Sequence, residues 1–94
     1  MSVYRVTEFA SPTPEKVATA CEAIIDVVAK AGAEMIDVVM MDDGHGLVIA
    51  RYSSEAAMKA ATRYNKEAFG ELVMADAVDG SSISSRSGEK VFSF

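Results

Sequence analysis

The chain has 94 residues, half of them hydrophobic, and a formal net charge of −5. This length predicts a single domain, residues 1–94, and the acidic balance with scattered basic residues argues against nucleic acid as a partner. The sequence contains no run of about twenty apolar residues and no signal-like N-terminus, so we predict a cytoplasmic protein that does not associate with membranes. Cys21 is the single cysteine, which fits a reducing compartment.

Residues 2–9 alternate and are rich in β-branched and aromatic side chains, which predicts a strand. A helix is expected over residues 14–31, because apolar residues recur there at helical spacing, with Cys21 on the buried stripe. Thr13 is the expected N-cap, followed directly by a proline in the first helical position. Gly32 is expected to end this helix in the left-handed conformation.

Residues 34–52 predict two strands joined by a tight polar turn at residues 42–46, with the sequence DDGHG. Both parities of the two strands are apolar, so both faces of this hairpin require cover. We expect Val38 to lie on the face away from the helices. The turn has two interpretations, a divalent-metal or phosphate site and a plain hairpin turn. The second is favoured, because the spacing matches no metal or phosphate motif and hairpin turns require Asp and Gly.

A second, alanine-rich helix is predicted to follow the hairpin, capped by Ser53 or Ser54. Gly70 is expected to interrupt this helix. The last segment, residues 81–94, is expected to supply a strand with an apolar end. A bulge or tight bend is expected at residues 86–88.

The order strand, helix, strand, strand, helix, strand predicts an α+β fold, the ferredoxin-like βαββαβ sandwich. In this fold both helices cover one face of a four-stranded antiparallel sheet. The opposite face of the hairpin is apolar as well, and an uncovered apolar face usually marks an interface. We therefore predict a homodimer that forms sheet against sheet, through the open face, about a two-fold axis.

Three stretches resemble the dimeric α/β-barrel proteins, and among them the antibiotic biosynthesis monooxygenase-like group. They are residues 51–57 (RYSSEAA), residues 69–72 (FGEL) and residues 88–94 (GEKVFSF). The resemblance implies a homodimer whose facing sheets form a barrel, with a pocket between each sheet and its helices. Members differ in activity: some oxidise aromatic polyketides without a metal or flavin, some degrade haem, and many have no assigned activity.

The chain departs from the catalytic features of this group. It has no tryptophan, a recurrent pocket residue in the group, and its one histidine is His45 in the hairpin turn. Where many members carry a histidine on the second helix, this chain has Ala60 and Ala61. Tyr52 alone falls where the group often has an aromatic pocket residue. The catalytic residues therefore stay unknown, and we predict no cofactor and no metal site.

The candidates for lining a ligand pocket are Tyr52, Tyr64, Arg51, Arg5 and Tyr4. The two arginines lie in neighbouring predicted strands. Each arginine either pairs with a carboxylate, such as Asp37 or Glu8, or holds an anionic or enolised ligand. The tyrosines either line a cavity beneath the helices, with Met58 and Phe69 as its apolar walls, or are core residues whose hydroxyl groups reach the surface.

The sequence leaves three functions open. The first is a homodimer that binds a small apolar or aromatic ligand between sheet and helices. The second is a cofactor-independent oxygenase or isomerase for an enolisable aromatic substrate, with a tyrosine as proton donor and an arginine holding the oxyanion. The third is a non-catalytic interaction module, which a solidly packed interface between helices and sheet would favour.

Overall fold

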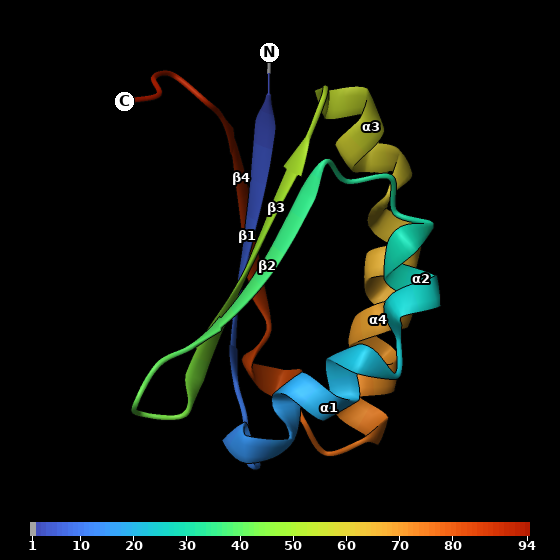
Figure 1. Ribbon diagram of the computed structural model, residues 1–94, viewed down its shortest axis with the longest axis vertical. Coiled ribbons are helices and arrows are strands. Elements are labelled where there is room, and N and C mark those ends of the chain that lie inside the picture. Colours follow the sequence, from blue (N-terminus) through green and yellow to red (C-terminus); the bar gives the residue numbers. More distant parts are fainter. Residues whose placement is uncertain (1) are drawn as a thin grey trace.

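The computed structural model describes residues 2–94, which form a sheet with helices on one of its faces (Figure 1). The strands are β1 (Val3–Ala10), β2 (Met35–Met40), β3 (His45–Tyr52) and β4 (Ser84–Glu89). The helices are α1 (Val17–Glu22), α2 (Ile25–Ala29), α3 (Glu55–Ala60) and α4 (Thr62–Met74), with short 3-10 helices η1 (Pro14–Lys16) and η2 (Gly80–Ser82). All strand pairs are antiparallel, in the order β2-β3-β1-β4, which confirms the predicted ferredoxin-like α+β fold.

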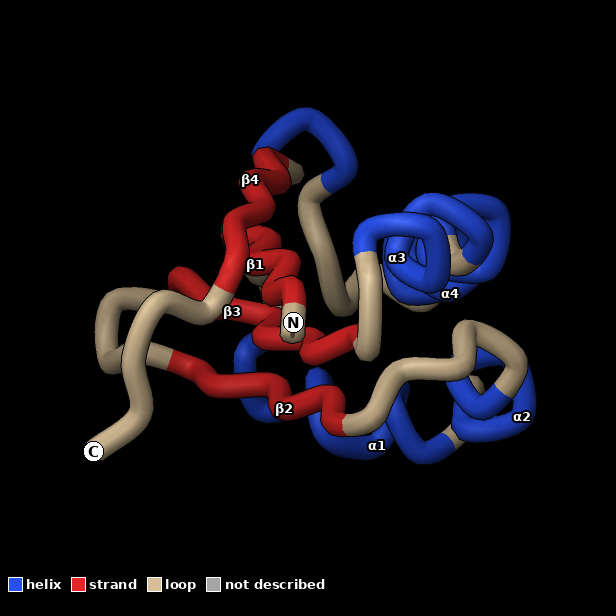
Figure 2. Tube along the Cα trace, turned by 90° about the horizontal axis from the view of Figure 1, so that it is seen from above, coloured by secondary structure: helices blue, strands red, loops and turns tan. Residues whose placement is uncertain are grey.

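Strand β1 lies inside the sheet, and its alternation defines two different faces. Val3, Thr7 and Phe9 are buried beneath the helices, whereas Glu8 is exposed on the other side. We call the side without helices the open face. Figure 2 looks at the sheet edge-on from the top of the molecule, with α2, α3 and α4 on the side opposite the open face. Residues paired across antiparallel strands share a face, so the register extends this alternation from β1 to all four strands.

Val38 lies on the helix-facing side of β2, so its predicted place on the open face was wrong. It pairs with Val48, and both side chains line a cavity beneath the helices. Its neighbours Asp37 and Val39 therefore belong to the open face. The error has a physical cause: both parities of this strand are apolar, so hydrophobicity alone does not tell the two faces apart.

The first helical segment is broken, whereas the sequence predicted one helix over residues 14–31. It consists of η1, α1 and α2, and at Ile24 the backbone leaves helical geometry, with φ −115° and ψ 15°. The Ile24 side chain is buried in the core at this break. Thr13 occupies the predicted N-cap position, but its side chain makes no capping bond; its hydroxyl donates a hydrogen bond to the Asp76 carbonyl at 2.7 Å. Gly32 has a φ of 71°, as predicted for the left-handed residue after the helix.

The second helical segment begins as predicted and continues without the predicted interruption. The Ser54 hydroxyl accepts a hydrogen bond from the Ala57 amide at 3.1 Å, which confirms it as the N-cap. After a change of helix at Ala61, α4 continues through Gly70 to Met74, so the predicted interruption at Gly70 was wrong. The buried Leu72 stabilises this part of the helix by about 1.5–3 kcal/mol, which exceeds the roughly 0.5–1 kcal/mol that a helical glycine costs.

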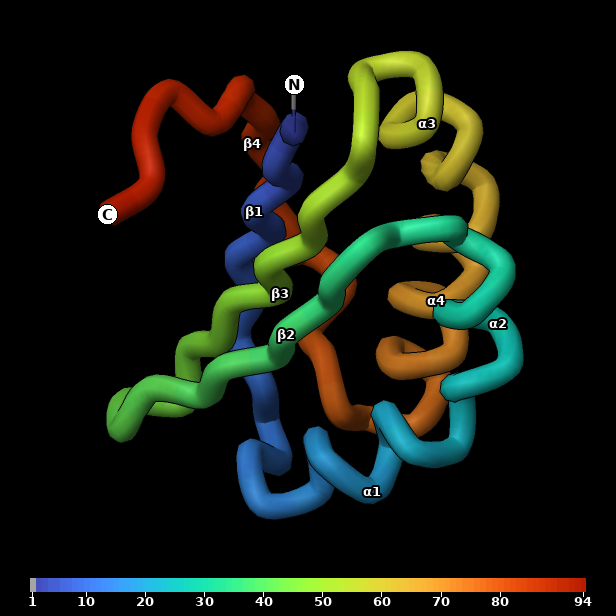
Figure 3. Tube along the Cα trace, turned by 45° about the horizontal axis from the view of Figure 1, so that its top comes forward, coloured from blue at the N-terminus to red at the C-terminus, as the bar shows by residue number. Residues whose placement is uncertain are grey.

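The core consists of two separate clusters of buried side chains between the sheet and the helices. The first cluster is Phe9, Val17, Ile24, Ala68, Leu72, Ala77 and Val78. The second cluster is Val3, Ala31, Ala50, Tyr52, Met58 and Ala61. Figure 3 shows α2 and α4 side by side over the sheet, where parts of both clusters lie. None of the helices within residues 2–94 is long and apolar enough to cross a membrane.

The C-terminal segment follows a regular strand. β4 pairs continuously with β1, from Ser84 opposite Glu8 to Glu89 opposite Val3, so the predicted bulge at residues 86–88 is absent from this strand. The backbone amide of Lys90 donates a hydrogen bond to the Ser2 carbonyl at 2.9 Å, and no further pairing of this segment follows within residues 2–94. The apolar end is exposed and extends on the open-face side of the sheet (Figure 1).

Candidate functional site

A cavity of about 350 Å³ lies between the sheet and the helices, with the two core clusters on either side of it. Most of its walls are apolar. The lining residues are Arg5, Thr7, Cys21, Ile24, Ile25, Val28, Ala29, Ile36, Val38, Val48, Ala50, Asn65, Ala68, Phe69 and Leu72. An apolar pocket with a few polar groups is the usual form of a small-molecule site.

A wider cleft of about 720 Å³ opens between α4 and the strands β1 and β4. Its walls carry more polar and basic groups than those of the cavity. The lining residues are Arg5, Thr7, Thr62, Asn65, Lys66, Phe69, Gly70, Val73, Gly80, Ile83, Ser85, Arg86 and Ser87. Arg5, Thr7, Asn65 and Phe69 line both spaces, so they mark the boundary between the apolar cavity and the polar cleft.

Arg5 brings a positive charge to this boundary. Its Nη2 donates a hydrogen bond to the Thr62 hydroxyl at 3.2 Å, and no carboxylate within residues 2–94 forms an ion pair with it. Glu8 and Asp37, the partners considered from the sequence, lie on the open face instead. A guanidinium has five N–H donors, so most of those of Arg5 have no acceptor among residues 2–94.

Tyr52 lies next to the boundary without lining it. Its side chain is fully buried in the second cluster, and its hydroxyl accepts a hydrogen bond from the Asn65 amide at 3.1 Å. This bond orients Asn65, whose side chain does line the cavity and the cleft. Tyr52 is thus a core residue that supports a pocket residue.

The remaining sequence candidates lie elsewhere. Tyr64 packs against the second cluster and carries the Arg63 guanidinium 4.5 Å from its ring centroid. Arg51 and Tyr4 pair with each other on the open face, and Arg51 forms an ion pair with Glu34 at 3.6 Å. Of the five candidates, the structure brings together Arg5 and, through Asn65, Tyr52.

The sequence predicted Phe69 as an apolar wall of the cavity but missed the polar residues on the same side of α4. Thr62, Asn65, Lys66, Phe69 and Val73 all line the cleft, and their spacing is that of one helical face. This stripe is readable in the sequence at helical spacing, but polar residues on one side of a helix ordinarily face solvent, and the alanine-rich stripe alone predicts contact with the sheet. Thr7 was also missed, because a threonine in a strand is ordinarily a packing residue.

Cys21 gives the cavity a chemical reporter. It is the single cysteine of the chain, it is partly buried, and burial raises the pKa of its thiol above the ordinary value. Since the thiolate is the reactive form, Cys21 should react slowly with iodoacetamide at neutral pH, and its rate should rise only at a higher pH than that of a cysteine in an unfolded peptide. Mass spectrometry of the alkylated fraction over time measures this, and a peptide-like rate would contradict the placement.

The hairpin turn has the contacts of a turn. The His45 amide donates a hydrogen bond to the Asp43 carboxylate at 3.0 Å, and this bond lowers the pKa of Asp43. The His45 ring lies 3.3 Å from the same carboxylate, and both side chains are exposed. Within residues 2–94 no three potential ligand side chains are grouped as a metal would require. The turn interpretation therefore agrees with the structure.

The chemistry of the site is that of binding and hydrogen-bond donation. Arg5, Asn65, Thr7 and Lys66 can all donate to a bound group. No aspartate, glutamate or histidine is among the described residues that line the cavity or the cleft. Lys66 in the cleft and Cys21 in the cavity are the lining side chains of a type that can act as a general base.

Comparison with solved structures confirms the ferredoxin-like fold. No family model and no curated protein sequence matches the chain. A dimeric ferredoxin-like protein from an uncultured marine organism superposes with a TM-score of 0.69 at 11% identity, covering 99% of this chain and 90% of its own.

Two further neighbours are candidate antibiotic biosynthesis monooxygenases. The protein from Bordetella bronchiseptica has a TM-score of 0.72 at 5% identity, with coverage of 97% of this chain and 98% of its own. The protein from Caulobacter crescentus has a TM-score of 0.67 at 22% identity, with coverage of 97% and 91%. At these identities the likeness establishes a shared fold, and the resemblance noted from the sequence is confirmed at that level.

Proposed function

We propose that this protein is a homodimer that binds a small molecule with an apolar or aromatic body and an anionic group. The body would occupy the cavity, and the anionic group would lie at its boundary with the cleft. The observation that carries this proposal is Arg5, which is partly buried at that boundary and has no carboxylate partner within residues 2–94. A partly desolvated guanidinium is most favourable when an anion accepts its hydrogen bonds.

The open face supports the homodimer. Tyr4, Val6, Leu47 and Ile49 form an apolar area over the middle two strands, with Val39 beside it on β2. An apolar face of this kind on a small domain requires cover. The neighbour from the marine organism is described as dimeric, which supports a second copy as the occupant. The presence of the cavity weighs against a purely structural interaction module.

Catalysis of an oxygenation or isomerisation is the second candidate function. The Arg5 guanidinium and the Asn65 amide stand together beside an apolar cavity, and such donors stabilise an enolate or phenolate oxygen. This candidate requires a substrate that is acidic enough to ionise without a carboxylate or histidine from the protein. Oxygen uptake with an acidic enol or phenol would support it, and binding without turnover would leave the protein as a binder.

Fluorescence titration with two related dyes tests the binding proposal. Anilinonaphthalene sulfonate has an aromatic body and an anionic sulfonate, and phenylnaphthylamine is the same body without the charge. Arg5→Met keeps most of the aliphatic stem and removes the charge. We expect it to weaken binding of the sulfonate dye about 10-fold to 100-fold, the range for one charge-assisted hydrogen bond, and to leave the neutral dye unchanged.

Arg51→Met is the matched control, because it removes the same charge from the open face. Its affinity for both dyes should equal that of the wild type. If Arg5→Met binds the sulfonate dye as tightly as the wild type, or if Arg51→Met weakens it equally, the proposed site is rejected. Both variants should unfold at wild-type denaturant concentrations, which excludes loss of the fold as the cause.

A further inference from the structure

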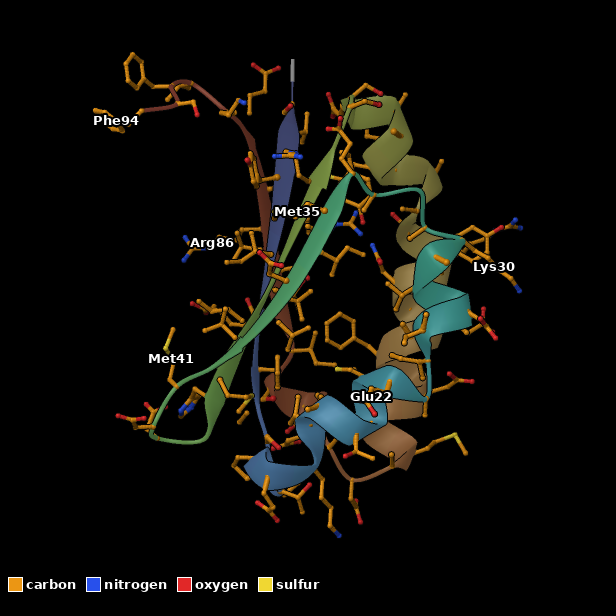
Figure 4. The ribbon with its side chains drawn as sticks, in the orientation of Figure 1. Glu22, Lys30, Met35, Met41, Arg86 and Phe94 are labelled. Carbon is orange, nitrogen blue, oxygen red and sulfur yellow. The ribbon has the colours of Figure 1, made fainter. Side chains whose placement is uncertain are left out.

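One row of residues crosses the open face with opposite charges at its two ends. Asp37 pairs with Ile49, Ile49 with Val6, and Val6 with Arg86, so these four lie side by side from β2 to β4. Asp37 and Arg86 are both exposed at the edge strands, and the two residues between them are apolar. Figure 4 shows Arg86 on the side of the sheet away from the helices.

These two charges cannot pair within one chain. Three strand spacings separate β2 from β4, which places the backbones of Asp37 and Arg86 about 14 Å apart. Neither residue forms an ion pair within residues 2–94. At this level along the strands the open face thus carries a negative charge at one edge and a positive charge at the other, while Glu8 and Arg51 lie on the middle strands in the rows to either side.

Two-fold symmetry limits how a second copy can cover this face. The axis that relates two stacked sheets lies in the plane between them. With the axis along the strands, each edge strand lies over the opposite edge strand of the partner, so Asp37 faces an arginine. With the axis across the strands at this row, Asp37 faces a second Asp37, and two like charges oppose each other at both edges. Like charges across an interface cost several kcal/mol.

We infer that two copies stack with the two-fold axis along the strands, so that Asp37 of each copy pairs with the partner's Arg86. This inference rests on the proposed homodimer and gives its geometry. Stacked sheets lie about 10 Å apart, a gap that an arginine and an aspartate side chain span together. Val6 and Ile49 of the two copies then pack together between the two ion pairs.

The arrangement also connects the interface with the cleft. Arg86 lines the cleft as well as the depression on the open face beside Tyr4 and Val6. The partner's Asp37 would hold the Arg86 guanidinium from the open-face side and fix one wall of the cleft.

Charge reversal tests the pairing. The dimer dissociation constants of Asp37→Arg, of Arg86→Asp and of the double variant are measured by sedimentation against the wild type. Each single reversal places like charges at both edges, so we expect the dimer to weaken about tenfold or more. The double variant restores opposite charges and should recover most of the wild-type affinity. Glu67→Arg, an equal change of net charge on an exposed position of α4, should leave the constant unchanged.

The possible failures are distinguishable. A wild-type protein that stays monomeric at all concentrations overturns the homodimer itself and, with it, this inference. The pairing alone is overturned if the wild type is a dimer and the single variants dimerise as tightly as it does. It is also overturned if the double variant dimerises as weakly as the single variants. Circular dichroism of each variant verifies that it is folded.

Chemical cross-linking gives a second measurement that does not depend on charge. In a Cys21→Ala background, a short bis-maleimide should join subunits of the Asp37→Cys/Arg86→Cys variant. It should not join subunits of Asp37→Cys alone, because the two copies of that residue lie at opposite edges of the interface. Efficient cross-linking of Asp37→Cys alone would place the axis across the strands and reject the inference.

Discussion

Replacing Gly46 by alanine should destabilise the protein strongly, by about 2–3 kcal/mol or more. Gly46 lies at the start of β3, opposite Phe9, and a Cβ atom there would meet the Phe9 ring and come within 2.8 Å of the Met40 sulfur. The Phe9 ring is 2% exposed and held in the first cluster, so it has little room to move. Urea unfolding at one protein concentration measures the change.

Two further variants test whether a steric contact with Phe9 causes the destabilisation by Gly46→Ala. Gly70→Ala adds the same methyl group to an exposed helical position where nothing lies within 4 Å, and it should stabilise by about 0.5–1 kcal/mol. Phe9→Leu removes part of the ring that the new methyl group would meet. The Gly46→Ala/Phe9→Leu double variant should therefore be more stable than Gly46→Ala alone. A double variant that is less stable than either single variant would show that the contact with Phe9 does not cause the destabilisation by Gly46→Ala.

Leu72→Ala is the second substitution with a large expected effect. Leu72 is 6% exposed, belongs to the first cluster and lines the cavity from α4. Truncating a buried leucine to alanine removes its contacts and enlarges the space beside it, which should lower the free energy of unfolding by about 2–5 kcal/mol.

Met74→Ala, on the same helix, is the matched control. Met74 is 88% exposed, so its truncation should change stability by less than about 0.5 kcal/mol. Equal effects of Leu72→Ala and Met74→Ala would contradict the assignment of the buried face of α4. Thermal or urea unfolding of both variants at the same concentration decides the matter.

The features that the sequence predicted well depend on local physical signals. The strand order follows from the alternation of elements and from the right-handed crossover. The Ser54 cap and the left-handed Gly32 follow from the preferences of single residues at helix ends. These signals act over a few residues, so they can be recognised in the sequence before any tertiary contact is known.

The features that the sequence predicted poorly depend on tertiary contacts. β2 carries apolar residues on both of its faces, with Ile36 and Val38 on one and Met35 and Val39 on the other, and only the position of the helices decides which face is covered. Gly70 lies in a continuous helix because burial of neighbouring side chains outweighs its own preference. Asn65 could be recognised as a site residue only from the fold, which places α4 over the helix-facing side of the sheet, next to Arg5.

The separation of the core into two clusters affects which parts of the molecule unfold locally and independently of each other. Met58 ties α3 to the second cluster, whereas Ala68 and Leu72 tie the later turns of α4 to the first, with the cavity between them. Native proteins open locally, in units defined by their contacts. Amide hydrogens of α3 and of the end of α4 should then exchange with solvent with different protection. A molecule seated in the cavity would bridge both units, and exchange would slow at both ends together.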